Sequence, residues 1–381
     1  MARLAFTGAR LFDGDRLVDD HHLIVEDGKV RAIASGVPST NLEIRTLDGG
    51  ILSPGFIDVQ VNGGGGILLN DDPTPGGMAH IATAHRRFGT TALLPTLITD
   101  TREKTRAALK AAISGAITGV AGLHLEGPHL DPARKGAHLA QYMRPLDEGD
   151  IALYSRAAAA IGALVVTLAA NQVTPAQVAR LSEAGVIVSI GHSNCTADEA
   201  EALFDAGARG VTHLYNAMSG LGHREPGLVG AMLARPGVWG GIIADGHHVD
   251  PRALKVAFAA KRDPGRLFVV TDAMALVGSD RQSFLLNGRT VTRDASGYCP
   301  RLTLEDGTLA GSDIDMASSL RFLVDRVGMP VADALRRATA DPADFLRIGH
   351  ERGRLIAGAR ADLVHLSDDL HVQSVWLSEQ L

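Results

Sequence analysis

Two patterns of hydrophobic and polar positions divide the chain. Over residues 1–52 the apolar residues form short alternating runs, separated by Asp13-Gly14 and Asp27-Gly28. Alternation is typical of strands with one buried face, and Asp-Gly pairs are typical of hairpin turns. Residues 353–381 have the same character, with strand-like runs at 361–366 and 373–377. We therefore predict a small β-sandwich domain that is built from both terminal segments, 1–52 and 353–381.

The central segment, residues 53–352, repeats a different unit. A short apolar run without alternation ends in polar residues, and an alanine-rich stretch with helical spacing often follows. Such runs are expected for parallel strands that are buried on both faces. We count eight of them: Gly55–Asn62, Thr91–Leu97, Gly122–Glu126, Leu164–Ala170, Val186–His192, Val211–Asn216, Trp239–Asp245 and Leu267–Asp272. The predicted helices between them include Met78–Phe88, Thr101–Ser114, Pro175–Ala184, Ala197–Asp205 and Pro251–Ala260.

This alternation of eight strands with helices predicts an α/β fold, a (β/α)8 barrel of the TIM type. A doubly wound sheet is the rival, but one unbroken series favours closure. Active sites of such barrels lie at the C-terminal ends of the strands. The polar residues that end each run are therefore the candidates for chemistry.

Glu126 and His192 end the third and fifth runs, and His213 lies in the sixth, so the barrel would bring all three to one rim. Two neutral imidazoles and one carboxylate suit a divalent metal, and three protein ligands leave a position open, as in catalytic sites. Such a metal lowers the pKa of water to about 7. Simpler interpretations also exist, because a single histidine is more often structural and Glu126 is also compatible with a salt bridge on the rim.

Asp272 ends the last run. A carboxylate there can accept a proton from an attacking water and return it to a leaving amine, although an aspartate after a strand also commonly caps a helix. Metal, water and carboxylate together predict hydrolysis of an amide or a related C–N bond. The run Gly63–Gly66 lacks a following Lys-Ser and the dinucleotide fingerprint, so we expect a flexible turn rather than a phosphate loop.

The composition narrows the function classes. A formal net charge of -6 argues against nucleic acid or an anionic membrane as partner, and no apolar run is long enough for a transmembrane helix. The N-terminus lacks the apolar segment of a secretion signal. The two cysteines, Cys195 and Cys299, make no disulfide framework, which favours a reducing compartment and hence the cytoplasm.

Nine motifs resemble those of one family, the N-acetylglucosamine-6-phosphate deacetylases of the amidohydrolase superfamily, in the same order over nearly the whole chain. They are Pro54–Asp58, His124–Pro128, Lys135–His138, Gly191–Ser193, Thr212–Met218, Arg224–Leu228, Asp245–Val249, Val270–Ala273 and Gly307–Ser312. One such motif is weak, but nine in register are specific. The resemblance implies a barrel hydrolase that converts N-acetylglucosamine-6-phosphate into glucosamine-6-phosphate and acetate.

The resemblance also implies residue roles. Glu126, His192 and His213 would hold the metal, Asp272 would be the catalytic acid and base, and His138 would polarise the acetyl carbonyl. The substrate contacts that it implies are Ala137, His138, Asn216, Ala217, Arg224, Asp245, His248, Leu309, Ala310, Gly311 and Ser312. Arg224 and His248 would face the phosphate, to which a guanidinium donates two hydrogen bonds at once. Arg224 would act within its own subunit or reach across a homodimer, and for both residues an ordinary surface position is the alternative.

The chain departs from many amidohydrolases at the end of the first strand, where Gln60 and Asn62 replace a His-x-His pair. Amides are poor metal ligands compared with imidazole, and the family has a branch of this form that is associated with one metal. We therefore expect one divalent ion per subunit, with zinc favoured and iron(II), manganese or cobalt compatible with the ligands. The segment 274–278 departs from the familiar pattern, which leaves the sugar preference open.

Three alternative functions are carried forward. The first is deacetylation of N-acetylgalactosamine-6-phosphate, which differs from the gluco sugar at one hydroxyl. The second is a non-catalytic barrel that binds a sugar phosphate or serves as a scaffold, although all four candidate catalytic residues are present. The third is a cyclic-amide hydrolase or deaminase, but these typically use the His-x-His pair that is missing here.

Overall fold

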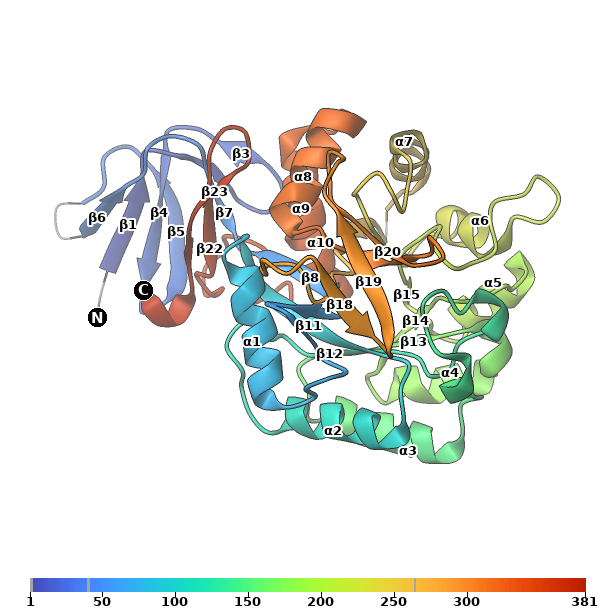
Figure 1. Cartoon of the computed structure of the whole chain (residues 1–381). Coiled ribbons are helices and arrows are strands. Elements are labelled where there is room, and N and C mark those ends of the chain that lie inside the picture. Colours follow the sequence, from blue (N-terminus) through green and yellow to red (C-terminus); the bar gives the residue numbers. More distant parts are fainter. Residues whose placement is uncertain (1–2, 40–41, 264) are drawn as a thin grey trace.

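The computed structural model describes residues 3–39, 42–263 and 265–381. Its centre is an eight-stranded parallel sheet in the order β17-β16-β15-β14-β13-β12-β11-β8, wrapped by helices (Figure 1). The strands are β8 (Phe56–Val61), β11 (Thr90–Ile98), β12 (Leu123–Glu126), β13 (Leu164–Leu168), β14 (Ile187–Ile190), β15 (Gly210–Val211), β16 (Trp239–Ile242) and β17 (Leu267–Val269). The eight predicted strands and the barrel are confirmed, although the sixth strand is only two residues long.

The barrel closes between its first and last strands, at what we call the seam. The backbone N–H of Asp272 donates to the Gln60 carbonyl at 2.9 Å, and that of Asn62 donates to the Ala273 carbonyl at 2.8 Å. Below these bonds the buried carboxylate of Asp58 accepts the Thr271 hydroxyl at 2.5 Å. Burial raises the pKa of Asp58 to about 7, despite the hydrogen bonds that favour its charged form. The seam therefore joins the first strand to Asp272 and to its two neighbours, Thr271 and Ala273.

Side-chain caps explain where the outer helices begin. Thr74, Thr101, Asp147, Thr174 and Thr196 each accept a backbone N–H from the first turn of the helix that follows. The helices are α1 (Pro75–Arg86), α2 (Arg102–Ile113), α3 (Glu148–Ala158), α4 (Pro175–Glu183), α5 (Ala197–Asp205), α6 (Gly227–Ala234), α7 (Pro251–Ala260), α8 (Met316–Phe322), α9 (Val331–Ala338) and α10 (Ala340–Phe345). Short 3₁₀ turns occur at Pro132–Arg134, Ala140–Tyr142, Ala170–Gln172 and Ser378–Gln380, and a π turn occurs at Leu323–Val327.

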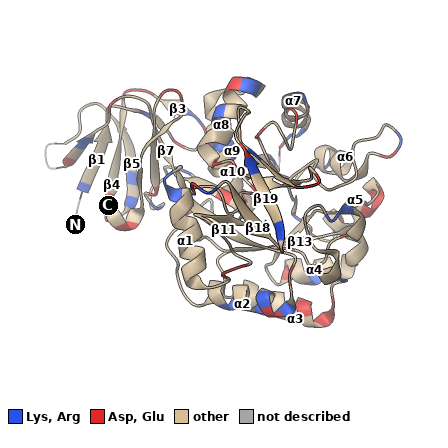
Figure 2. Cartoon of the chain, in the orientation of Figure 1, with Lys and Arg blue, Asp and Glu red and all other residues tan. Residues whose placement is uncertain are grey.

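Charged side chains of both signs lie on these helices. Figure 2 shows both basic and acidic segments in the region of α2 and α3. No helix in the described ranges has the length and apolarity needed to cross a bilayer.

The two ends of the chain meet in a β-sandwich beside the barrel (Figure 1). One sheet has the order β5-β4-β1-β6 and the other the order β23-β22-β7-β2-β3. Apolar residues from both sheets, among them Phe6, Leu23, Leu52 and Leu363, pack into one core. The strands are β1 (Arg3–Thr7), β2 (Arg10–Phe12), β3 (Leu17–Val18), β4 (His21–Glu26), β5 (Lys29–Ser35), β6 (Glu43–Thr46), β7 (Ile51–Pro54), β22 (Leu363–Leu366) and β23 (Val372–Trp376).

A second small sheet, which the sequence analysis did not predict, lies over the C-terminal rim of the barrel. This insertion sheet is antiparallel and consists of β18 (Ser283–Leu286), β19 (Arg289–Asp294), β20 (Arg301–Leu304) and β21 (Leu309–Ser312). Its last strand reaches the seam, because Ser312 forms a bridge with Ala273. The pairs Asn287-Gly288 and Asp306-Gly307 between its strands are the hairpin signal that could have revealed it.

The glycine run forms a short hairpin between β9 (Gly63–Gly64) and β10 (Ile67–Leu68). The backbone N–H groups of Gly63, Gly65 and Gly66 donate to carbonyls of Ala273, Val277 and Ala275. These donors are therefore committed to the segment that follows Asp272, which argues against a phosphate loop and holds the turn in place.

Candidate active site

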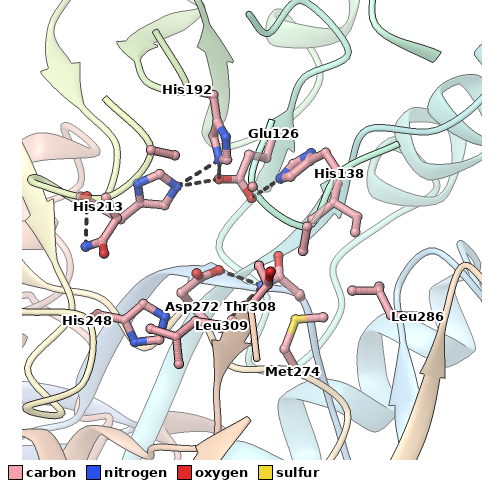
Figure 3. A pocket seen from close by; sticks show the side chains of 17 residues that line it. Glu126, His138, His192, His213, His248, Asp272, Met274, Leu286, Thr308 and Leu309 are labelled. Atoms are coloured by element: carbon pink, nitrogen blue, oxygen red, sulfur yellow. Dashed lines mark hydrogen bonds and ion pairs between the residues drawn. The ribbon is translucent and has the colours of Figure 1, made fainter. Parts of the chain in front are cut away.

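A cavity of about 270 Å³ opens at the C-terminal rim, and most of the predicted site residues line it (Figure 3). Glu126 ends β12, while His192 and His213 each follow a strand end by two residues. Their side chains are buried, and a ligand atom from each lies within 4.8 Å of the others. We call these three residues the metal cluster.

The geometry of the metal cluster fits a cation. Glu126 Oε1 lies 2.8 Å from His213 Nε2 and 3.2 Å from His192 Nε2, and the two Nε2 atoms are 3.1 Å apart. His192 Nδ1 lies 2.8 Å from the Arg134 carbonyl, to which it can only donate, so the lone pair of a neutral His192 is on Nε2. Two imidazole nitrogens and a carboxylate oxygen that crowd one point are the donor set of a divalent metal.

The backbone is strained at these positions. His192, His213 and Asp272 have φ values of 46°, 35° and 53°, in the left-handed region that non-glycine residues rarely adopt. Each such residue costs about 1–3 kcal/mol and is retained mainly where the surroundings require it. The strain aims the three side chains into the cavity from the ends of their strands.

Asp272 faces the metal cluster and is held by two amides. Gln60 Nε2 and Asn62 Nδ2 donate to Asp272 Oδ1 at 3.1 and 2.6 Å, and Gln60 Nε2 also lies 3.0 Å from Glu126 Oε1. Asp272 Oδ2 accepts no hydrogen bond from the described residues. Burial, followed by the nearby charge of Glu126, raises the pKa of Asp272 to about 6. This places Asp272 in the range of a group that gains and loses a proton near neutral pH.

His138 lies on the opposite side of Glu126 and is a neutral donor. Burial lowers the pKa of His138 to about 3. Its Nδ1 accepts the backbone N–H of Thr99 at 3.4 Å and lies 2.9 Å from the Thr99 hydroxyl. The remaining proton is therefore on Nε2, which lies 3.8 Å from Glu126 Oε2. A carbonyl oxygen at this point would receive a hydrogen bond from His138.

The other end of the cavity is polar and is lined by Asn216, Ala217 and His248. His248 Nδ1 lies 2.6 Å from Asp245 Oδ2. Burial disfavours the charged imidazole, but the hydrogen bond and charge of Asp245 outweigh it, so the pKa of His248 is raised. Asp245 does not line the cavity and instead orients His248, since it also accepts the backbone N–H of His247 and His248.

The remaining predicted residues divide into two groups. Ala137, Leu309 and Gly311 line the cavity. Ala310 and Ser312 alternate with them along β21 and face away from it: Ala310 is in the core of the insertion sheet, and the Ser312 hydroxyl donates to the Thr271 carbonyl at 2.5 Å.

Arg224 is exposed and lies outside the cavity of the single chain, in the segment before α6 that extends away from the barrel (Figure 1).

The sequence analysis missed five residues that build the site, of which Ile98 lines the cavity at the end of β11. Thr99 follows the second strand and orients His138, so its place at a strand end was a usable signal. Met274, Leu286 and Thr308 line the cavity, but nothing in an apolar side chain or an exposed turn residue distinguishes this role in a sequence.

Comparisons with known proteins agree with this geometry. Residues 51–379 match the model of the amidohydrolase family. The N-acetylgalactosamine-6-phosphate deacetylase of Shewanella sp. (strain ANA-3) is 40% identical over 98% of this chain and 94% of its own. The N-acetylglucosamine-6-phosphate deacetylase of Bos taurus is 34% identical over 97% of this chain and 90% of its own. The crystal structure of N-acetylglucosamine-6-phosphate deacetylase from Pasteurella multocida has a TM-score of 0.93 and 34% identity, and 99% of each chain is covered.

Proposed function

We propose, from the premise that this chain belongs to the amidohydrolase family, that it hydrolyses the acetamide of N-acetylglucosamine-6-phosphate to glucosamine-6-phosphate and acetate. The observation that carries the proposal is the convergence of Glu126, His192 and His213 on one point of a cavity that Asp272 also faces. A barrel that only bound sugar phosphates would have no use for this strained and buried arrangement.

The metal ligands, Asp272 and His138 have different roles in the proposed reaction. A divalent metal, when bound to the cluster, supplies a Lewis acid that makes water a better nucleophile and polarises the carbonyl. Asp272 accepts the proton of the attacking water. The Nε2–H of His138 donates to the acetyl oxygen and stabilises the negative charge that develops there. Asp272 then delivers its proton to the leaving nitrogen, and acetate departs.

We propose a single metal ion, with zinc favoured and iron(II), manganese or cobalt as alternatives. Gln60 and Asn62 occupy the positions at which a second metal would need imidazoles, and their side-chain N–H groups already donate to Asp272. The ligand set of one carboxylate and two imidazoles does not discriminate among these ions.

The polar end of the cavity would bind the phosphate through Asn216, Ala217 and His248. No arginine or lysine lines the cavity among the described residues. We therefore propose that the chain forms a homodimer in which Arg224, exposed in the single chain, completes the neighbouring phosphate site. The two cysteines are buried and unpaired, which supports a cytoplasmic location.

Deacetylation of N-acetylgalactosamine-6-phosphate is the second candidate. The Shewanella relative, at 40% identity, carries that name, whereas the gluco name belongs to the bovine protein at 34% and to the Pasteurella structure. Because the two sugars differ at one hydroxyl, a direct comparison of the two sugar phosphates as substrates decides between them.

Acetate release by the zinc-loaded protein tests these proposals. We expect turnover of N-acetylglucosamine-6-phosphate, and the ratio of kcat/KM for the two sugar phosphates ranks the two candidates. Unphosphorylated N-acetylglucosamine should be a poor substrate. Equal turnover with and without the phosphate would exclude the assigned phosphate end, and no acetate from any of the three would exclude the deacetylase.

A further inference from the structure

The cavity has two unlike ends, and only the polar end has been assigned to a part of the substrate so far. Figure 3 shows His213 and His248 on one side, Met274 and Leu286 on the other, and Glu126 and Asp272 between them. The first side carries the polar groups that suit a phosphate. The apolar residues of the second side have no role so far.

The second side is apolar and comes from one hydrophobic cluster. Ile98, Met274 and Leu286 line the cavity and are 5%, 3% and 1% exposed. They belong to the core of the insertion sheet, which also includes Leu302 and Ala310. We call these three residues the acyl wall.

Four polar backbone groups near the acyl wall are already bonded within the protein. The Ile98 N–H and carbonyl are bonded to the Asn70 side chain at 3.1 and 3.0 Å. The Ala137 carbonyl accepts a hydrogen bond from Arg289, and the Met274 N–H donates to the Ser312 carbonyl at 3.0 Å. A polar group that was pushed against the wall would therefore find these four backbone groups already bonded.

The stereochemistry of the acyl carbon links this wall to the reaction. Of its three substituents, the oxygen must lie near the Nε2–H of His138, and the nitrogen must lie near Asp272, which protonates it. The sugar is attached to the nitrogen and extends to the polar end at His248. The third substituent, which is the methyl group of an acetamide, must then point to the opposite end of the cavity.

We infer that Ile98, Met274 and Leu286 form the surface that selects the N-acyl group, with Leu286 setting its length. This inference rests on the proposed deacylation and assigns the part of the substrate that the phosphate end does not recognise. The wall accepts a methyl group, and each further methylene costs about 10–200-fold in kcat/KM. A hydroxyl, as in an N-glycolyl group, costs about 100-fold because it loses water without gaining a partner.

The test compares N-acetyl, N-propionyl and N-glycolyl forms of one sugar 6-phosphate in the zinc-loaded enzyme. Leu286→Ala should raise the ratio of propionyl to acetyl kcat/KM by about 10-fold or more, because it adds room at the wall. Met274→Ala should raise the same ratio, and Leu286→Phe should lower acetyl turnover while an N-formyl substrate is retained. Each ratio is measured within one preparation, so a loss of folded protein cancels.

Leu302→Ala is the matched control. It removes the same volume from the same cluster, but Leu302 does not line the cavity, so the ratio should stay at the wild-type value. An unchanged ratio in Leu286→Ala and Met274→Ala, or an equal shift in Leu302→Ala, would overturn the acyl wall while acetate release stands. A wild type that releases no acid from any of these substrates would instead overturn the deacylase and the wall together.

Discussion

The metal cluster and the acyl wall lie in one cavity but are built in opposite ways. The metal cluster is carried by the ends of parallel barrel strands, where His192 and His213 adopt left-handed backbone and approach Glu126 within 3.2 Å. The acyl wall is the edge of an ordinary hydrophobic core, in which Met274 and Leu286 pack without charge. Strain and burial of charge are concentrated on the side that does chemistry.

This contrast suggests that the two sides can change independently. The backbone of the barrel rim is held in place by the hydrogen bonds of the seam, and the Asp272 side chain is held by the two amides that donate to it. The insertion sheet is not part of the barrel, and it is attached to the rim through the bridge between Ala273 and Ser312 and through the side chains of Arg289 and Arg293. Substitutions on the rim should therefore abolish the reaction, whereas substitutions in the insertion sheet should change which substrate is taken.

The largest effect is expected at Asp272. Asp272→Asn keeps the shape of the side chain but cannot accept the proton of water or return it to nitrogen, so kcat should fall by up to about 10⁴-fold. Acetate release measures this loss, and elemental analysis provides the control. Metal content should be unchanged because Asp272 is outside the metal cluster. A variant that keeps a tenth of the activity would remove Asp272 from the catalytic role.

The buried carboxyl group of Asp58, under the rim, should make the free energy of unfolding depend on pH. Burial raises its pKa from 3.8 to about 7. The folded state therefore holds a proton that the unfolded chain releases between these two values. The contribution of Asp58 to the free energy of unfolding is complete below pH 4 and is lost as the pH rises to about 7. For three pKa units this contribution is on the order of 4 kcal/mol.

Asp58→Asn should remove this dependence, since an amide does not titrate and can still bond to Thr271. Urea unfolding at pH 5, 6, 7 and 8 measures the difference between wild type and variant. We expect the wild type to lose stability relative to the variant across this range. A constant difference would show that Asp58 does not change its charge there.

The residues of the rim could be predicted from sequence, because they stand at the ends of parallel strands. A strand that is buried on both faces leaves an apolar run, and the first charged residue at or after its end marks the rim, as at Glu126 and Asp272. Residues as distant as His124 and Thr212 then come together through topology alone, bridged by the Thr167 hydroxyl at 2.8 and 2.7 Å.

The acyl wall was not predictable, because an apolar side chain that faces a cavity resembles one that faces a core. The insertion sheet escaped notice since its strands are short and partly exposed, so its alternation is weak. Arg224 shows a different limit. In the proposed role it would act on a neighbouring subunit, and the pattern of the exposed segment before α6 carries no signature of such a contact.

His138 should give a smaller effect than Asp272. His138→Ala removes the Nε2–H donor and should lower kcat by about 100-fold. His138→Gln restores an N–H at a similar reach and should recover part of the loss. Because burial lowers the pKa of His138 to about 3, the wild-type imidazole is neutral from pH 5 to 9. The ratio of wild type to alanine variant should therefore be constant over that range, and a ratio that changes with pH would exclude a neutral donor.

The smallest effect is expected at Arg293, which fastens the insertion sheet to the segment that carries Met274. Its guanidinium bonds to the buried carboxylate of Asp313 at 2.5 and 3.0 Å and to the carbonyls of Leu276 and Arg281 at 2.7 and 3.0 Å. Lysine keeps the charge but offers its donors from a single atom, so Arg293→Lys cannot reach all of these acceptors. The segment after Asp272 should loosen on the acyl side while the metal cluster is undisturbed.

We therefore expect Arg293→Lys to raise KM roughly 3–10-fold, with kcat nearly unchanged, because substrate positioning is lost and the reacting groups are kept. Arg301→Lys is the control, since Arg301 lies in the same sheet but pairs with Asp294 at the exposed surface. Steady-state kinetics on the acetyl and propionyl substrates measure both variants. A fall in kcat without a change in KM would mean that the insertion sheet supports the reacting groups themselves, and the division between a chemical side and a selective side would then not hold.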